Sequence, residues 1–299
     1  MRAAVYTGDL IRLTAGPWSA VIAPVGAAVQ SLQLNGRDVI DPAPLTAVNT
    51  AFQGVLLAPW PCRLDGGRYD AHGQALAAPV TEAATGTALH GLTPFAEFTV
   101  RSTTGSSAVL THTIAPSPGY PFRVRITAEF TLTEKGLDTM VTADNLGHAD
   151  APYGMGPHPY LVAGSGPIDE WRLEVPADQV LLMDERMLPR ALRNAQDEPD
   201  YDFRPERSAP LGPRAIDNTY TSLTAGRVTL FSADGSQGAA VEFDPAALPW
   251  VQIYTRRDGR GSVAVEPLTC PPNAFASGTD LLWIEPDTSV QRSWRITGW

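Results

Sequence analysis

Hydrophobic and polar residues alternate with a period of two along much of the chain. Between residues 124 and 132, apolar side chains occupy every second position, and Arg, Thr and Glu side chains stand between them. Because successive side chains of a strand point to opposite faces, this pattern predicts a strand with one face in the core. Residues 136–143 continue in the same style and predict a second strand.

Turn residues divide the pattern into hairpins. Residues 31–34 and 37–40 flank Asn35-Gly36, and both turn residues tolerate a positive φ. Residues 227–231 and 239–243 flank a turn that contains Ala-Asp-Gly-Ser. Three further strand candidates are residues 250–254, 281–284 and 292–296.

Little of the chain favours helices. Its 26 Gly and 27 Pro residues interrupt the sequence roughly every eight to twelve positions, a spacing that suits strands. Residues 181–195 have helical composition, but Pro189 interrupts them, so we predict a loop with room for one helical turn. No repeat, low-complexity tract or linker divides the chain. We therefore predict an all-β fold, a large antiparallel β-sandwich, in one domain over residues 1–299.

Composition and charge narrow the classes of partner. The net charge of −10 argues against nucleic acid and anionic membranes, which select basic surfaces. The first residues contain no apolar segment long enough for a signal peptide, and no later run is long enough to span a bilayer. Two cysteines, Cys62 and Cys270, do not form a disulfide framework. We expect a soluble cytoplasmic protein whose thiols are reduced.

The stretch from Val263 to Phe275 contains the first candidate for chemistry. Its β-branched start predicts a buried strand that ends at Glu266, and Pro267 follows directly. Proline fixes φ, so this proline and the pair at 271–272 stiffen the loop and hold Glu266 in place. A fixed position suits a catalytic base. A surface glutamate before a proline-rich turn is the alternative interpretation.

Four other stretches set polar or ionisable residues among Gly, Pro and aromatic residues: 58–64, 88–92, 153–160 and 215–220. They contain Arg63, His90, His158 and Asp217. His158 lies between two prolines, which restricts its motion, and its apolar surroundings lower the imidazole pKa unless a carboxylate opposes them. A packed structural histidine is the alternative interpretation.

Other chemistries lack their usual sequence patterns. No two histidines lie within four residues of each other, so we predict no metal site. Neither Cys62 nor any serine lies in a nucleophile elbow or a Cys-His arrangement. No glycine-rich stretch connects a strand to a helix, so we predict no nucleotide cofactor.

Five stretches form an ordered set that covers nearly the whole chain. They are Pro59-Trp60-Pro61-Cys62-Arg63, Leu89-His90-Gly91, Pro118-Gly119-Tyr120-Pro121-Phe122, Gly156-Pro157-His158-Pro159-Tyr160 and Glu266-Pro267-Leu268-Thr269-Cys270-Pro271-Pro272-Asn273-Ala274-Phe275. In this order they resemble the motifs of the aldose 1-epimerase (mutarotase) family, in its bacterial subgroup. The resemblance implies a single large β-sandwich with a sugar-binding cleft and no cofactor.

The resemblance also implies a role for each candidate residue. Glu266 would be the general base and His158 the general acid, while Arg63, His90 and Asp217 would bind and orient a monosaccharide substrate. The chain departs from the family in two places, and both bear on substrate choice. Cys62 replaces the Asn that commonly precedes the cleft arginine, and Thr93-Pro94-Phe95 replace the Arg and Trp expected after His-Gly.

The chemistry of anomer exchange suits these residue types. The reaction takes a proton from the C1 hydroxyl and gives one to the ring oxygen, so that the ring opens and recloses on the other face. A base and an acid on opposite sides of the ring suffice, and each is worth about 10²–10⁴-fold. We expect Trp60, Tyr160 or Phe275 to face the apolar side of the sugar.

Alternative functions remain open at this point. A carbohydrate-binding protein without turnover would keep the cleft but needs no acid–base pair. A glycoside hydrolase or lyase would use Asp217 and Glu266 as its carboxylate pair. The substrate could be a hexose, a deoxy sugar, or a phosphorylated or sulfonated hexose. An anionic sugar needs a cationic cleft, to which Arg256, Arg257 and Arg260 could contribute unless they form a solvated turn. The oligomeric state is not predicted.

Overall fold

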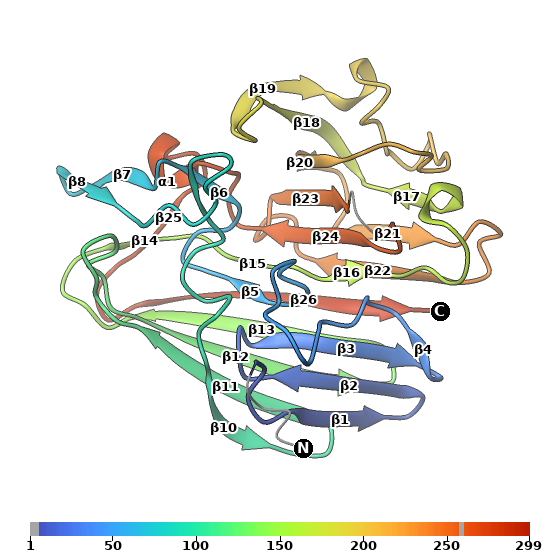
Figure 1. Ribbon diagram of the computed structural model, residues 1–299, viewed down its shortest axis with the longest axis horizontal. Helices are drawn as coiled ribbons and strands as arrows, with labels where there is room; N and C mark the ends of the chain where they lie inside the picture. Colours follow the sequence, from blue (N-terminus) through green and yellow to red (C-terminus); the bar gives the residue numbers. More distant parts are fainter. Residues whose placement is uncertain (1–5, 257–259) are drawn as a thin grey trace.

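Two layers of antiparallel strands enclose the apolar core (Figure 1). The computed structural model describes residues 6–256 and 260–299. The first layer is one eight-stranded sheet. In spatial order its strands are β10 (Thr99–Thr103), β11 (Ser107–Ile114), β12 (Val124–Thr133), β13 (Gly136–Asn145), β26 (Ser289–Gly298), β22 (Gly238–Phe243), β21 (Arg227–Phe231) and β17 (Arg172–Glu174).

The second layer joins two sheets edge to edge. The four-stranded sheet contains β1 (Ile11–Ala15), β2 (Trp18–Ala23), β3 (Ala28–Leu34) and β4 (Arg37–Asp38), in this order. The six-stranded sheet runs β16 (Tyr160–Leu161), β24 (Val263–Leu268), β23 (Trp250–Thr255), β20 (Asp217–Leu223), β18 (Ala177–Met183) and β19 (Pro189–Asn194). A bridge between Ile40 and Leu161 connects the two sheets. The layer therefore extends from β1, low in Figure 1, to β19 at the top.

Short elements connect and flank the two layers. The two-stranded pairs are β5 (Leu56–Leu57) with β15 (Gly156–Pro157), β6 (Arg63–Asp65) with β9 (Thr87–Leu89), β7 (Arg68–Ala71) with β8 (Gln74–Ala77), and β14 (Ala151–Tyr153) with β25 (Leu282–Ile284). The helical elements described are α1 (Ala274–Ser277) and the 3₁₀ turns η2 (Ile168–Glu170) and η3 (Ala195–Asp197). Within the described ranges, no helix has the length and apolar character needed to cross a membrane.

The alternating pattern produces the core as predicted. In β12 the side chains of Val124, Ile126 and Ala128 are fully buried, while the residues between them are partly or fully exposed. Burial of a large apolar side chain contributes about 1.5–3 kcal/mol. The strands predicted over residues 136–143, 250–254, 281–284 and 292–296 are confirmed as β13, β23, β25 and β26.

Both predicted hairpins are also confirmed. Strands β3 and β4 pair in register around Asn35 and Gly36, whose φ values are 52° and 78°. These are the two positive φ angles that a tight two-residue hairpin turn requires. Strands β21 and β22 pair from Arg227 opposite Glu242 to Phe231 opposite Gly238.

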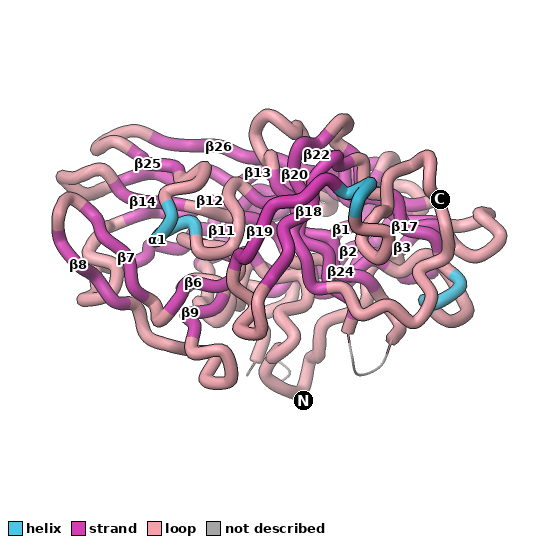
Figure 2. Tube along the Cα trace, turned by 90° about the horizontal axis from the view of Figure 1, so that it is seen from above, coloured by secondary structure: helices cyan, strands magenta, loops and turns pink. Residues whose placement is uncertain are grey.

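The loop predicted over residues 181–195 is wrong. These residues form most of the β18–β19 hairpin, and Pro189 is the first residue of β19. Strand β19 is the last strand of its sheet, where the missing N–H of a proline interrupts no hydrogen-bond ladder. In Figure 2, which views the molecule from above, β18 and β19 lie nearest the viewer.

The predicted end of the strand at Glu266 is wrong by two residues. Strand β24 continues through Pro267 to Leu268, and Glu266 lies inside it. The amides of Val265 and Thr269 donate to Pro159 and Met155, on the flank away from β23. By alternation the nitrogen of Pro267 faces the same flank, so the pairing with β23 needs no N–H there.

Candidate active site

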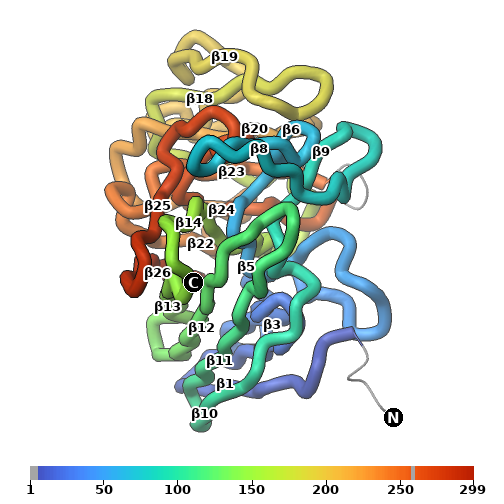
Figure 3. Tube along the Cα trace, turned by 90° about the vertical axis from the view of Figure 1, so that its left-hand side faces the viewer, coloured from blue at the N-terminus to red at the C-terminus, as the bar shows by residue number. Residues whose placement is uncertain are grey.

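A cavity of about 570 Å³ opens on one face of the six-stranded sheet. All five residues predicted from the sequence line it: Arg63, His90, His158, Asp217 and Glu266. They come from β6, the turn after β9, the segment between β15 and β16, β20 and β24. Figure 1 and Figure 3 both show β6 near β20 and β23. The structure thus brings the five together, and their roles remain predictions.

Strand register builds the polar base of the cavity, which we call the floor: Asp217, Thr219, Gln252, Tyr254 and Glu266. Gln252 lies opposite Glu266 on one side and Thr219 on the other, and Tyr254 lies opposite Asp217. Residues directly opposite each other point to the same face of a sheet. The intervening residues, such as Val265 and Ile253, point into the apolar core.

Hydrogen bonds fix the amide of Gln252 in the floor. The Thr219 hydroxyl donates to Gln252 Oε1 at 2.5 Å, and Gln252 Nε2 donates to Asp217 Oδ1 at 2.6 Å. An amide held at both its oxygen and its nitrogen has one orientation. The carboxylate of Asp217 is therefore held in a defined position at the cavity.

The backbone holds His158 tightly. Its N–H donates to Val55, and its carbonyl accepts from the Gly54 amide. Upstream, a Cβ on Gly156 would lie 2.4 Å from the Pro267 carbonyl oxygen, so only glycine allows the chain to approach β24 this closely. The imidazole stacks on Tyr160 with ring centroids 5.1 Å apart. The restricted, apolar setting predicted for His158 is what the structure shows.

The side chains of His158 and Glu266 contact each other at the cavity. Nε2 of His158 lies 3.3 Å from Oε1 of Glu266, and both residues are buried. Burial raises the pKa of Glu266 well above its ordinary value, with the nearby charge of Asp217 as the second cause. Burial lowers the pKa of His158 to about 3. Because burial disfavours a charge on either group, we assign the contact to a neutral carboxylic acid and a neutral imidazole that share one proton.

The same pair carries unmet hydrogen-bonding capacity. Glu266 Oε2 and His158 Nδ1 are buried without a hydrogen-bond partner in the described protein, and so is Nδ1 of the neighbouring His90. Each such atom destabilises the fold by about 1–3 kcal/mol. Because these three atoms belong to residues that line the cavity, a ligand bound there could supply their missing hydrogen bonds.

His90 approaches from the turn after β9 with a φ of 62°. Its amide donates to the Cys62 carbonyl at 2.8 Å. A Cβ on the next residue, Gly91, would lie 2.1 Å from the Ala58 carbonyl oxygen, so the His-Gly motif depends on glycine here. The His90 ring meets Phe52 and His158 edge-on. Burial and the neighbouring His158 lower the pKa of His90 well below its ordinary value.

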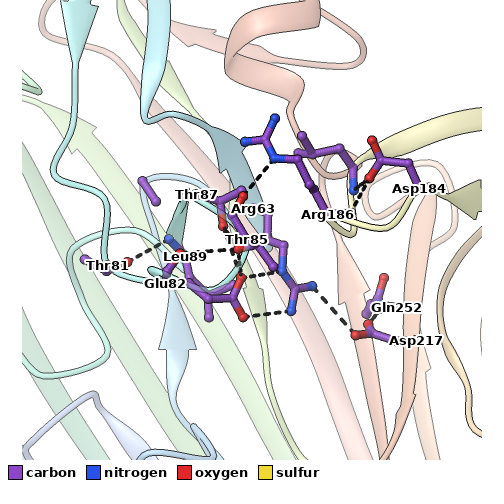
Figure 4. Close-up of polar contacts among 12 residues, drawn as sticks. Arg63, Thr81, Glu82, Thr85, Thr87, Leu89, Asp184, Arg186, Asp217 and Gln252 are labelled. Carbon is purple, nitrogen blue, oxygen red and sulfur yellow. Dashed lines mark hydrogen bonds and ion pairs between the residues drawn. The ribbon is translucent and has the colours of Figure 1, made fainter.

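Arg63 lies on β6 opposite Leu89 and extends toward the floor. Its Nε and Nη2 donate to the two oxygens of Glu82 at 2.7 and 3.1 Å. Its Nη1 lies 3.7 Å from Oδ2 of Asp217 (Figure 4). The guanidinium therefore bridges two carboxylates on different sides of the cavity.

Several lining residues were not predicted from the sequence: Phe52, Glu82, Gln252 and Tyr254. Gln252 carried a usable signal, because it is a polar residue within an otherwise apolar strand. Glu82 carried none, since its importance comes from contact with Arg63. Of the aromatic residues expected to face a sugar, Tyr160 lines the cavity. Trp60 and Phe275 do not, because both are buried in the core with ring centroids 5.5 Å apart.

The basic residues before β24 divide among different environments. Arg256 lines the cavity, with Nη1 4.0 Å from Asp41. Arg260 lies elsewhere and pairs with Asp169 at 2.7 Å. Arg257 lies outside the described residues.

Both cysteines are buried free thiols. Cys62 lines the cavity and packs in a small cluster with Leu181, Trp250 and Leu268. Burial raises the pKa of Cys62 well above its ordinary value and that of Cys270 to about 12. Among residues 6–256 and 260–299, no group of three or more His, Cys, Asp or Glu side chains could hold a metal ion.

Solved structures with the same fold bear the names of sugar epimerases. An Escherichia coli K12 protein described as a candidate aldose 1-epimerase superposes with a TM-score of 0.85 at 20% identity, covering 97% of this chain and 99% of that one. A galactose mutarotase-like protein of Clostridium acetobutylicum gives a TM-score of 0.84 at 18% identity, covering 97% and 95%. At these identities the likeness shows the fold alone, and it confirms the predicted all-β, mutarotase-like architecture.

Sequence comparison identifies the family as well as the fold. YihR, a protein of Escherichia coli strain K12 described as uncharacterized, is 33% identical over 282 residues, which are 93% of this chain and 90% of YihR. The family model described as aldose 1-epimerase matches residues 9–297. The chain belongs to the aldose 1-epimerase family.

Proposed function

We propose that the protein is an aldose 1-epimerase that interconverts the α and β anomers of a free aldose. The contact between buried His158 and Glu266 in the cavity is the observation that supports this most. Binding alone needs no acid–base pair, whereas a carboxylate and an imidazole with displaced pKa values in a cavity are typical of acid–base catalysis.

The pair holds the single proton that the reaction requires. Catalysis needs an ionised Glu266 to accept the C1 hydroxyl proton and a protonated His158 to donate to the ring oxygen. Transfer of the shared proton across the 3.3 Å contact converts the resting pair into this form without exchange with solvent. The ring opens, C1 rotates about its bond to C2, and the reverse transfers close the ring on the other face.

From the sequence we expected a base and an acid on opposite sides of the sugar ring, whereas the side chains of Glu266 and His158 contact each other at 3.3 Å. Adjacent groups fit the chemistry because the hydroxyl and the ring oxygen are both bonded to C1. On the cavity walls, the donors of Arg63 and His90 and the carboxylate of Asp217 orient the remaining hydroxyls.

Polarimetry on freshly dissolved sugars tests the proposal. The panel contains α-glucose, α-galactose, a deoxyhexose, a hexose 6-phosphate and a sulfonated hexose, each corrected for uncatalysed mutarotation. We expect enzyme-dependent acceleration with at least one sugar. Binding of a sugar without acceleration would support the carbohydrate-binding alternative, and release of reducing sugar from disaccharides would support a hydrolase.

A further inference from the structure

The loop over residues 81–87 closes on itself beside the cavity. The amides of Thr81 and Glu82 both donate to the Thr87 carbonyl, and the amides of Gly86 and Thr87 both donate to the Glu82 carbonyl. Glu82 and Thr85 from this loop line the cavity. The loop is therefore a compact, hydrogen-bonded unit that carries one carboxylate at the cavity wall.

Protein donors occupy both oxygens of the Glu82 carboxylate. Arg63 Nη2 binds Oε1, while Arg63 Nε, the Thr87 hydroxyl and the Thr85 hydroxyl all bind Oε2. Burial alone would raise the pKa of Glu82, but the bonds from Arg63 and Thr85 outweigh it and leave the pKa below its ordinary value. Glu82 is therefore ionised at neutral pH, and its hydrogen bonds are already made before a sugar arrives.

This ion pair decides how Arg63 faces the cavity. A guanidinium has five N–H donors in a rigid plane, and the edge formed by Nε and Nη2 is taken by Glu82. Nη1 remains on the side of Asp217, at 3.7 Å. With Glu82 absent, nothing in this arrangement would prevent the fork from turning its bidentate edge to Asp217 and withdrawing Nη1 from the sugar.

A second arginine holds the loop from the other side of the cavity mouth. Arg186, in the turn between β18 and β19, donates from Nε to the Thr85 carbonyl at 2.9 Å (Figure 4) and from Nη2 to Asp65 at 2.6 Å. Its sequence neighbours Glu185 and Met187 line the cavity. The loop is thus fixed by Arg63 on the inside and by Arg186 on the outside.

We infer that Glu82 is a positioning residue for sugar binding. It holds the guanidinium of Arg63 so that Nη1 faces the substrate, and its carboxylate partly neutralises the charge of Arg63. The inference rests on the proposed function of the cavity as a sugar site. Glu82 touches neither the reacting atoms nor the acid–base pair in this role, and it acts through Arg63.

The variant Glu82→Gln tests this inference. The amide keeps the size of the side chain but accepts from Arg63 at only one of its two atoms. For the sugar that the wild type turns over fastest, KM should rise about 10- to 100-fold, the range for losing a charge-assisted bond, with a smaller change in kcat. The less compensated charge of Arg63 also favours the ionised form of Glu266, so the basic limb of the pH–activity profile should move to lower pH.

Three further variants separate positioning from general structural damage. Asp138→Asn breaks an ion pair of the same bidentate geometry with Arg295 on the eight-stranded sheet, and it should change neither KM nor the pH profile. Glu82→Asp keeps the charge but shortens the reach, so it should raise KM and leave the basic limb in place. Thr87→Val removes one donor to Glu82 and should raise KM by less.

The outcomes distinguish this inference from the proposed function. If the wild type turns over a sugar, while Glu82→Gln shows the KM and basic limb of Asp138→Asn, the inference is overturned. If the wild type binds sugar by calorimetry without turnover, the proposed function fails. A weaker affinity of Glu82→Gln would then still support the inference, and an equal affinity would overturn it. If the wild type binds none of the sugars, both fail.

Discussion

The floor and the wall of the cavity hold their carboxylates in opposite states. Glu266 in the floor is fully buried, has a raised pKa, and has one oxygen without a hydrogen-bond partner among the described residues. Glu82 in the wall keeps some solvent exposure, has both oxygens occupied and has a lowered pKa. The first group is strained in a way that favours proton transfer, and the second is satisfied in a way that favours fixed geometry. This contrast matches the roles that we propose for the two residues: Glu266 reacts with the sugar, and Glu82 positions Arg63.

The largest expected effect comes from removing the proposed proton acceptor, Glu266. Glu266→Gln keeps the shape of the side chain but cannot accept a proton, so anomerisation should fall about 10²–10⁴-fold. Sugar affinity, measured by calorimetry, should change much less. A variant that keeps more than about a tenth of wild-type turnover in polarimetry would refute the assignment of Glu266 as the base.

The proton donor gives the next effect. His158→Asn should lower turnover about 10²-fold or more without a matching loss of sugar affinity. In the proposed mechanism, the shared proton sets the pH limits of wild-type activity. The acidic limb should follow the lowered pKa of His158, about 3, and the basic limb the raised pKa of the pair at Glu266.

His158→Asn should no longer show a pH–activity profile with both an acidic and a basic limb. The pH profiles of both proteins, measured by polarimetry and corrected for base-catalysed background, test this. If the variant keeps the wild-type rate and profile, His158 is a packed structural histidine. His90, whose ring lies 5.2 Å from that of His158, is then the next candidate donor.

Replacing the two glutamates should change the stability of the fold in opposite directions at pH 7. The folded state holds a proton on Glu266 that the unfolded state releases above the ordinary pKa, so Glu266 destabilises the fold as the pH rises. Glu266→Gln should therefore unfold at higher temperature than the wild type at pH 7, and the gain should shrink toward pH 4. Glu82 has a lowered pKa and stabilises the fold above its ordinary value. Glu82→Gln should therefore cost about 1–3 kcal/mol at pH 7.

Denaturation curves of the three proteins at pH 4 and pH 7 check this contrast. Asp138→Asn serves as the control for losing a bidentate ion pair outside the cavity. The two glutamate variants need not change by equal amounts. At pH 7, however, Glu266→Gln must be more stable than the wild type and Glu82→Gln less stable. If both are destabilised to the same extent, the floor does not hold Glu266 in a strained state.

Residues with a local signal could be assigned to the fold and the site from the sequence. Alternation gave the strands, because burial on one face leaves a period of two. The unusual context of His158, with a proline on each side and a tyrosine two residues later, marked a residue that lines the cavity in the structure. These features depend on near neighbours in the chain, which a sequence displays directly.

Features that depend on tertiary partners could not be predicted. Glu82 lies in an unremarkable loop, and it reaches Arg63 only because β6 and β9 pair and bring the loop back to the cavity. Trp60 shares a motif with Arg63, but its indole donates to the Ala88 carbonyl in the core and does not face the cavity. Pro189 fits a strand because that strand is the edge of its sheet, and edge position is a property of the assembled layer.

A smaller effect is expected at the outer anchor of the wall. Arg186→Gln removes the bond to Asp65 and weakens the hold on the Thr85 carbonyl. Both charged side chains are nearly half exposed, so the loss of stability should stay below about 1 kcal/mol. KM should rise only about two- to fivefold, because Arg63 still holds the loop from inside. An increase as large as that of Glu82→Gln would mean that the outer anchor, and not Glu82, positions the wall.

The smallest effect is expected at Cys62, which lines the cavity but is assigned no role in either the reaction of Glu266 or the positioning by Glu82. Burial raises the pKa of its thiol, so the side chain is neutral at working pH and offers no charge to the sugar. Its φ of 54° lies in the left-handed region, which Asn tolerates better than most residues. An asparagine at this position would gain from the backbone conformation, but the apolar neighbours Leu181, Trp250 and Leu268 oppose this gain in stability, because they leave a buried amide without partners.

Cys62→Ala should keep turnover within about twofold and lose about 1 kcal/mol of stability, mainly from lost packing. Cys62→Asn should change stability by less than about 1 kcal/mol in either direction, since backbone relief and burial of the amide offset each other. Polarimetry and thermal unfolding of both variants measure this, together with titration of two free thiols in the denatured, non-reduced wild type. A loss of turnover in Cys62→Ala comparable to that of His158→Asn would mean that the thiol takes part in the reaction. The contrast between Glu266 in the floor and Glu82 in the wall would then not be enough to explain the site.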